Sequence, residues 1–378
     1  MAEGIYQRLG VRRVIHAAGT TTRYGGSLLR PEALDAMREA SPMLVNMDEL
    51  NAAAGAAIAR LLGAEAAFIT AGASAGLILQ AAACIAGDDP AKIARLPDTR
   101  GMKNEIVLQR AHRFAYDQAY RVAGGVLVEI GLARRTQAFE LEDAITERTA
   151  AVAYLISPFT RPPGILSLEE VIAIAHRRQV PVIVDAASML PPRDNLTKFI
   201  RLGADLVSFS GGKGIRGPQS TGFLLGRRDL IRGVALNGSP NQAVGRAAKT
   251  SKEEIAGLLT ALELFLGEDE AAEMKRYRDV CTTVADGLAG IHGLRVVVEQ
   301  DPVNRVIPHT CIYFTEDWRG PCPHAVQVAL ATGEPHIYVQ QGGHQGGYFD
   351  EIAIVPINLQ PGDEPILVKR LREELARG

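Results

Sequence analysis

The chain has 378 residues, a formal net charge of −2, 47% hydrophobic residues and 22% charged residues. A charge so close to zero gives no electrostatic reason to expect a nucleic acid or a membrane as partner. No run of about 18 apolar residues occurs, so no transmembrane helix is predicted, and the length favours about two domains of a soluble globular protein.

The N-terminal stretch MAEGIYQRLGVRRVIHAAG has no apolar core of the kind found in signal peptides. The four cysteines are scattered and lack the spacing of metal ligands: Cys84, Cys281, Cys311 and Cys322. We therefore expect reduced thiols, no metal site and a cytoplasmic protein.

Residues 1–45 are expected to form a lead-in segment, with a helix that begins at Pro31. Asp48 then suits the cap of a helix that runs to Leu62 and ends at Gly63. From there to about residue 240, short apolar runs alternate with helical segments. We expect strands at residues 66–70, 105–109, 126–130, 151–156, 181–185, 205–209 and 221–225.

This alternation predicts an α/β fold, in which a mostly parallel sheet carries helices on both faces. The large domain is expected to span residues 46–240. Residues 241–378 are expected to supply linking helices and a smaller α+β domain. Its strands are expected at residues 295–299, 311–315, 336–340 and 351–357.

The stretch GADLVSFSGGKGIRGPQSTGFLLG places one lysine, Lys213, in a glycine-rich turn between two apolar strands. The glycines permit unusual backbone conformations or the close approach of another group. A lysine in such a turn has little packing to do, so we interpret Lys213 as the Schiff-base lysine of a pyridoxal 5′-phosphate enzyme.

Pyridoxal phosphate needs three kinds of group, and the chain offers each in order. Its phosphate needs N–H groups and hydroxyls, which the turn TAGASAG provides at a helix start through Gly72, Ala73 and Ser74. Its ring nitrogen needs a carboxylate, and Asp185 ends an apolar strand. Lys213 supplies the amine. Ser208 and Ser210 are further candidate phosphate ligands, and His112 is a candidate to stack on the ring.

Other uses of a glycine-rich lysine turn fit less well. A Walker phosphate loop needs G-x-x-x-x-G-K-[ST], but Val207 stands at the first glycine position and Gly214 follows the lysine. No Rossmann G-x-G-x-x-G opens a first βα unit, and no G-x-S-x-G occurs.

The lysine stretch, together with VIVDAAS, TAGASAG and GRAAKTSKEEI, resembles the selenocysteine-synthase-like branch of fold-type-I pyridoxal phosphate enzymes. Within that branch it is most similar to the D-glucosaminate-6-phosphate ammonia-lyase group. The resemblance covers nearly the whole chain and implies a homodimer or larger assembly with active sites at the subunit interface. One departure is His16, where the branch is expected to carry asparagine.

Carried over residue by residue, the resemblance implies Lys213 as the Schiff-base lysine, Asp185 as the partner of the pyridine nitrogen and His112 as the ring-stacking residue. It further implies that Ser74 and Ser210 serve the phosphate and that Thr221 reaches a neighbouring subunit's phosphate.

The resulting expectation is a lyase that eliminates water and ammonia from a hydroxylated amino acid, or from an amino-sugar acid such as D-glucosaminate 6-phosphate, and yields a 2-oxo acid. Lys213 would act as the base at the α carbon. A racemase or epimerase is the main alternative, because His16 or a tyrosine could supply the acid–base group on the opposite face. A catalytically silent binding module is a second alternative. Selenium transfer is not expected, since the chain has no basic patch for a transfer RNA.

The sequence does not decide which residue binds the substrate carboxylate. Four arginines are candidates: Arg305, Arg246, Arg23 and Arg161. His344, in the segment GGHQGGY, is a further histidine that could enter the site.

Overall fold

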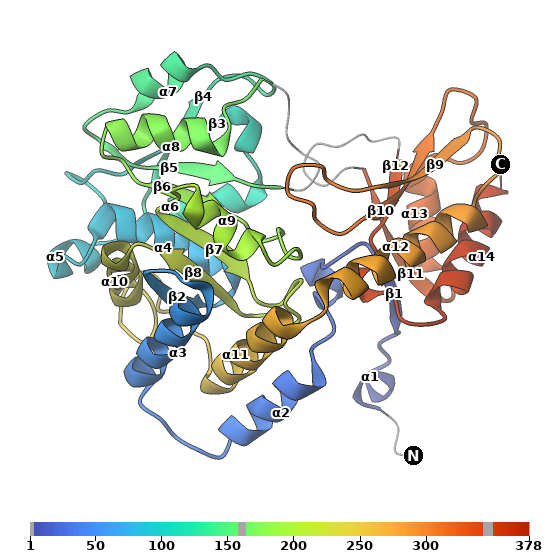
Figure 1. Cartoon of the computed structure of the whole chain (residues 1–378), viewed down its shortest axis with the longest axis horizontal. Coiled ribbons are helices and arrows are strands. Elements are labelled where there is room, and N and C mark those ends of the chain that lie inside the picture. The colour runs from blue at the N-terminus through green and yellow to red at the C-terminus, as the bar shows by residue number, and fades with distance from the viewer. Residues whose placement is uncertain (1–3, 158–163, 343–350, 378) are drawn as a thin grey trace. The chain divides into compact units, whose positions relative to one another are not determined.

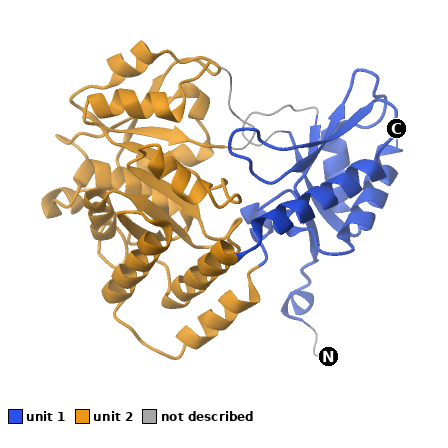
Figure 2. Cartoon of the chain, viewed as in Figure 1, with its two compact units in different colours: residues 1–28, 158–160, 268–378 blue, residues 29–157, 161–267 orange. Residues whose placement is uncertain are grey.

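The chain is described by a computed structural model, which covers residues 4–157, 164–342 and 351–377. Figure 1 labels its helices and strands. The chain divides into two compact units, coloured separately in Figure 2: residues 1–28 and 268–378 (unit 1), and residues 29–157 and 161–267 (unit 2). Arg161 and His344 lie outside the described residues. Among the described helices, none is both long enough and apolar enough to cross a bilayer.

Unit 2 contains a seven-stranded sheet whose described strands follow the order β2–β8–β7–β6–β5–β3–β4. The strands β4, β3, β5, β6 and β7 run parallel, while β8 is antiparallel to both β7 and β2. The mostly parallel sheet confirms the predicted α/β class. The strands are Ala66–Thr70 (β2), Glu105–Gln109 (β3), Val126–Ile130 (β4), Thr149–Leu155 (β5), Val182–Asp185 (β6), Leu206–Ser210 (β7) and Gly222–Gly226 (β8).

Helices cover both faces of this sheet because successive strand residues point to opposite sides. Ile183 and Leu206 pack in one apolar cluster with Leu77 and Leu79 of α4, whereas Val182 and Val207 alternate with them and are also buried. The helices of unit 2 are Pro31–Ala40 (α2), Met47–Leu62 (α3), Gly72–Ala86 (α4), Pro90–Ile93 (α5), Gln118–Val122 (α6), Ala138–Ala144 (α7), Leu168–Arg177 (α8), Asn195–Arg201 (α9), Arg228–Asn237 (α10) and Lys252–Gly267 (α11).

Unit 1 has a five-stranded sheet in the order β1–β11–β12–β10–β9, with helices packed on it. Its first strand comes from the N-terminal lead-in and pairs in parallel with β11, more than 300 residues later. The elements are Ile5–Arg8 (α1), Val14–Ala17 (β1), Glu270–Gly287 (α12), Leu294–Glu299 (β9), His309–Phe314 (β10), Pro323–Thr332 (α13), His336–Gln341 (β11), Glu351–Ile354 (β12) and Asp363–Leu375 (α14).

Two local predictions are corrected by the structure. Asn46, rather than Asp48, caps α3, because its side chain accepts hydrogen bonds from the backbone N–H groups of Asp48 and Glu49. Helix α4 begins at Gly72, within the predicted turn TAGASAG rather than after it. The small residues of its first turn allow the helix to lie close to the sheet, which local propensity alone does not reveal.

Candidate active site

The parallel strands bring the predicted residues to one edge of the sheet in unit 2. β3, β5, β6 and β7 all end at this edge, and β2 ends there too because it is antiparallel to β8, which is itself antiparallel to β7. In open α/β sheets, ligands bind beyond the carboxyl ends of the strands. His112, Asp185, Lys213 and the start of α4 therefore share one end of the sheet.

Lys213 is partly buried in the turn that follows β7. Its Nζ donates a hydrogen bond to Ser188 Oγ over 2.7 Å. Burial lowers the pKa of Lys213, and the negative charge of Asp185 opposes that shift. The lysine therefore loses its proton more readily than a lysine in water, as a nucleophile or a base requires.

The glycines around Lys213 serve close contact between segments of the chain. A Cβ on Gly214 would lie 2.2 Å from the Leu190 carbonyl oxygen, and one on Gly212 would lie 2.3 Å from Gln219 Cα. The positive φ in this turn belongs to Arg216, at 61°, and not to these glycines. The glycines are thus needed to pack the lysine turn against neighbouring backbone.

Asp185 ends β6 and is 5% exposed. Its Oδ1 accepts a hydrogen bond from the Ala187 N–H over 3.0 Å. Burial raises the pKa of Asp185, while the Ala187 N–H and the charge of Lys213 lower it. The carboxyl group is therefore desolvated and faces a cation, which suits it to hold a protonated ring nitrogen.

His112 lies in the short 3-10 helix Arg110–His112 after β3 and is 5% exposed. Its ring meets Tyr154 of β5 edge-on, with 4.4 Å between ring centroids. Among the described residues, its Nδ1 has no hydrogen-bond partner. Burial lowers the pKa of His112 to about 4, so the ring is neutral at physiological pH and free of a competing charge.

The start of α4 is open to a ligand. Gly72 has φ +73° as the first residue of this 15-residue helix, and no described side chain caps it. Ser74 in the first turn is exposed. Uncapped N–H groups at the positive end of a helix favour a phosphate.

The hydroxyls of Ser208 and Thr221 have partners within the protein. Ser208 is fully buried, and its Oγ donates to the Ala73 carbonyl oxygen over 3.3 Å. Thr221 is also fully buried, and its Oγ1 donates to the Pro218 carbonyl oxygen over 2.6 Å. Ser210, the last residue of β7, is 9% exposed.

His16 belongs to unit 1, in an aromatic cluster. It is 7% exposed and is the register partner of Tyr338 across β1 and β11. Tyr24 lies 5.4 Å from the His16 ring and 4.2 Å from the Tyr338 ring. Within the described part of the chain neither ring nitrogen of His16 has a partner, and burial lowers its pKa to about 4.

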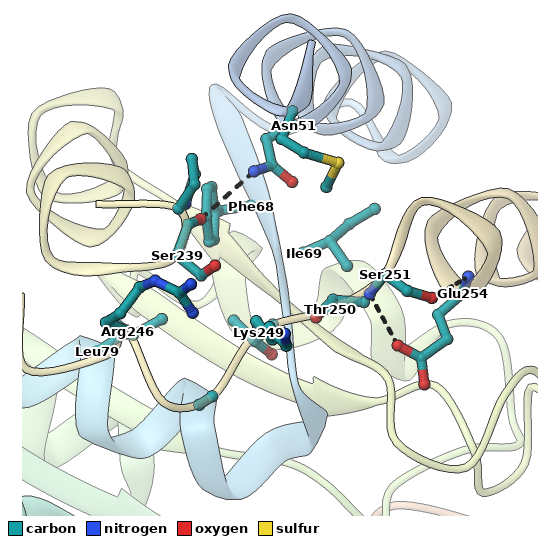
Figure 3. A pocket seen from close by; sticks show the side chains of 14 residues that line it. Asn51, Phe68, Ile69, Leu79, Ser239, Arg246, Lys249, Thr250, Ser251 and Glu254 are labelled. Atoms are coloured by element: carbon teal, nitrogen blue, oxygen red, sulfur yellow. Dashed lines mark hydrogen bonds between the residues drawn. The ribbon is translucent and has the colours of Figure 1, made fainter. Parts of the chain in front are cut away.

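The described candidate arginines lie in different places. Arg246 and Lys249 line a pocket of about 380 Å³ in unit 2, with Phe68 and Thr70 of β2 (Figure 3). Arg23 is exposed in the 3-10 helix Thr22–Tyr24, and Arg305 has φ 54° in a loop after β9. Of these, Arg246 shares a pocket with a strand that leads into the start of α4.

Two polar residues with contacts near the candidate site were not singled out from the sequence: Ser188 and Gln80. In the sequence, Ser188 is only one of the small residues in VIVDAAS, and its hydrogen-bond partner Lys213 lies 25 residues further along the chain. Gln80 of α4 is fully buried, and its Nε2 donates to the carbonyl oxygens of Val184 and Leu206 over 3.2 Å each. A glutamine within the otherwise apolar run from Gly76 to Ala86 was the available signal.

These residues fit pyridoxal phosphate. The site offers an amine of lowered pKa, a buried carboxyl group next to it, an uncapped helix start and a buried neutral imidazole with an unpartnered nitrogen. These are the groups that the aldehyde, the ring nitrogen, the phosphate and the ring of this cofactor require.

Comparison with known proteins places the chain in a family. The model of SelA, L-seryl-tRNA selenium transferase, matches residues 21–285. The chain belongs to the SelA family. The predicted resemblance to the selenocysteine-synthase-like branch is thereby confirmed, and the family together with the fold implies pyridoxal phosphate as its cofactor.

Two relatives match this SelA-family chain over nearly its full length. It is 34% identical over 377 residues to D-glucosaminate-6-phosphate ammonia lyase of Salmonella typhimurium, with 99% of this chain and 98% of the relative covered. It is 33% identical over 377 residues to 5′-C-glycyluridine monooxygenase-decarboxylase of a Streptomyces species, with 98% and 92% covered.

Solved structures agree with the fold. The structure of D-glucosaminate-6-phosphate ammonia-lyase matches with a TM-score of 0.82 at 33% identity and covers 99% of both chains. Ureidoglycine-glyoxylate aminotransferase of Bacillus subtilis matches with a TM-score of 0.64 at 14% identity, over 97% of this chain and 94% of that one, which is a likeness of fold alone.

Proposed function

We propose that this SelA-family chain is a pyridoxal phosphate-dependent ammonia-lyase. Its substrate would be a hydroxylated amino acid or an amino-sugar acid of the D-glucosaminate 6-phosphate type, and its products a 2-oxo acid and ammonia. The observation that carries this proposal is the full-length relationship to D-glucosaminate-6-phosphate ammonia lyase. The lysine, carboxyl group and helix start at one sheet edge support it.

Each residue of the edge has a proposed role toward the cofactor. Lys213 would hold the aldehyde, Asp185 the ring nitrogen and His112 the ring face. The N–H groups of Gly72, Ala73 and Ser74 would hold the phosphate, with Ser210 at the end of β7.

We assign Ser208 and Thr221 supporting roles within the same site. Ser208 would fix the start of α4 through its bond to Ala73, and Thr221 would fix the lysine turn through its bond to Pro218. When bound, pyridoxal phosphate supplies the electron sink that makes the α hydrogen of the substrate acidic.

Proton handling falls to Lys213. With the cofactor and substrate bound, the Nζ lone pair of Lys213 would take the α proton, and the electrons of the broken C–H bond would stay on the substrate. The resulting ammonium then gives a proton to the β-hydroxyl, which leaves as water. The β carbon would then gain a proton as the amino nitrogen loses one, and a second water would replace that nitrogen, which leaves as ammonia, so that the carbon skeleton ends as a 2-oxo acid.

The test is direct. We expect purified protein reconstituted with pyridoxal phosphate to absorb in the visible range, and borohydride to fix the cofactor on the Lys213 peptide. With D-glucosaminate 6-phosphate or simple hydroxylated amino acids, we expect equal amounts of 2-oxo acid and ammonia. Lys213→Ala should lose both signals. Fixation without any keto acid from the whole panel would refute the lyase assignment.

The same assay separates the competing reactions. Deuterium uptake at the α carbon without keto acid would indicate racemisation or epimerisation, the alternative expected from the sequence. Oxygen consumption with release of carbon dioxide would instead indicate chemistry like that named for the Streptomyces relative.

We further propose a homo-oligomer in the cytoplasm. Its support is the exposed apolar segment between α2 and α3, where Met43, Leu44 and Val45 are 54%, 97% and 48% exposed. Exposed apolar patches of this kind mark association surfaces. Light scattering should give a mass of at least twice 40.5 kDa, and replacing Leu44 with Asp should lower it. Cell fractionation tests the location.

A further inference from the structure

A serine hydroxyl contacts the lysine at the centre of the site. Lys213 Nζ donates to Ser188 Oγ over 2.7 Å, the short distance expected of a bond from an ammonium group. Ser188 lies three residues after Asp185, in the turn that follows β6. One turn therefore presents both a carboxyl group and a hydroxyl to the lysine.

That turn is held by hydrogen bonds of its own. The Ala187 N–H donates to Asp185 Oδ1 over 3.0 Å, and the Met189 N–H donates to the Ala186 carbonyl oxygen over 3.1 Å. Asn195, 1% exposed, donates from Nδ2 to the Met189 carbonyl oxygen over 2.8 Å. Ser188 is thus carried by a backbone fixed on both sides.

The turn is also held against the lysine loop. Gly214 follows Lys213 directly, and its Cα packs so closely on the Leu190 carbonyl that a Cβ would lie 2.2 Å from the oxygen. Leu190 lies two residues after Ser188. Contact between the two backbones thereby sets the distance between the serine and lysine side chains.

A hydroxyl suits a lysine that changes its protonation state. It accepts a hydrogen bond from an ammonium group and can turn to donate to a neutral amine, whereas an ionised carboxylate only accepts. Asp185 is the charged group that acts on Lys213 from this turn. Ser188 can therefore hold Nζ in both states of a proton transfer.

We propose that Ser188 is a positioning residue for Lys213, holding the lysine amine in place whenever that amine is not bonded to the cofactor. This inference rests on the proposed function. During the reaction Ser188 neither gains nor loses a proton. Nζ takes the α proton and later gives one up, and Ser188 keeps the amine from turning away between these steps.

The first test uses the apoenzyme and needs no turnover. Wild type, Ser188→Ala, Ser188→Thr and the matched surface control Ser41→Ala are reacted with pyridoxal, which lacks the phosphate, and reduced with borohydride. Labelling of the Lys213 peptide is measured against pH. Removing an acceptor from an ammonium group should move the labelling midpoint down by about one pH unit in Ser188→Ala only.

The second test uses the holoenzyme. For Ser188→Ala, α-deuterium uptake and kcat should fall roughly tenfold with KM unchanged, and Ser188→Thr should restore both. If Ser188→Ala fails to fold, Ser188→Cys decides, since a thiol is a weaker partner of similar size. A midpoint or an exchange rate equal to that of wild type would overturn the proposal. Absence of turnover in wild type would overturn only the proposed function, because the apoenzyme test still stands.

Discussion

Replacing Gly214 with alanine should disrupt the candidate site from its backbone. The added Cβ would lie 2.2 Å from the Leu190 carbonyl oxygen and 2.6 Å from its carbonyl carbon, whereas ordinary contacts begin near 3.4 Å. The obstacle is backbone, so no side chain can swing aside, and the two turns must move apart by more than 1 Å. Overpacking of this kind costs about 1–3 kcal/mol.

The same movement should break the 2.7 Å bond between Lys213 and Ser188. We expect Gly214→Ala to lower the urea midpoint of unfolding, measured by circular dichroism, and to weaken the visible absorption of bound cofactor.

The matched control is Gly267→Ala at the end of α11, where a Cβ would meet nothing within 4 Å. There, alanine should be neutral or stabilise by up to about 1 kcal/mol. Equal midpoints and equal cofactor spectra for the two variants would refute the reasoning.

Three further predictions follow from buried groups. Burial lowers the pKa of His112 from 6.5 to about 4 in the folded protein, so the free energy of unfolding should fall as the pH drops from 6.5 towards 4. In urea titrations, His112→Phe should remove about 2–3 kcal/mol of the stability loss between pH 7 and pH 4.5. Equal acid sensitivity of the variant and the wild type would contradict this. A Cβ on Gly76 would lie 2.5 Å from Ser208 Oγ but 3.5 Å from Ser208 Cβ. Gly76→Ala should therefore destabilise the protein, and adding Ser208→Ala should restore its stability in a double-mutant cycle. Additive effects of the two substitutions would count against this contact. His16→Asn should leave cofactor absorption intact while changing the ratio of keto acid to α-deuterium exchange, and an unchanged ratio would argue against any role of His16 in the reaction.

Much of the fold was readable from the sequence because its signals are local. The spacing of Ser167 and Glu170 in the sequence is typical of a capping box, and this box forms at the start of α8. Gly63 ends α3 in the left-handed conformation. The apolar runs form strands within two residues of their expected bounds, except that the strand expected at residues 351–357 ends at Ile354. Such signals depend on neighbours in the chain, so no tertiary contact is needed to interpret them.

Long-range pairing was not readable in the same way. The run Val14–Ala17 is too short to reveal its partner, and its strand forms only by pairing with β11 at the other end of the chain. That pairing then places His16 beside Tyr338, and both rings contact Tyr24 in one aromatic cluster. The domain limits at residues 46–240 and 241–378 stay predictions.

For the site, the sequence by itself determined which chemistry is on offer. A lysine among glycines, an aspartate at a strand end and small residues at a helix start are residue types whose chemistry does not depend on the fold. Only the tertiary structure decided which of these residues lie close together and how burial changes their pKa values. Parallel pairing carries strand ends 25 or more residues apart to one edge, where burial lowers the pKa of Lys213 and raises that of Asp185. The same packing lets the Ser208 hydroxyl donate a hydrogen bond to the Ala73 carbonyl oxygen of α4 and lets the Ser188 hydroxyl accept one from Lys213. These partners depend on distances of a few ångströms, which no pattern in the sequence encodes.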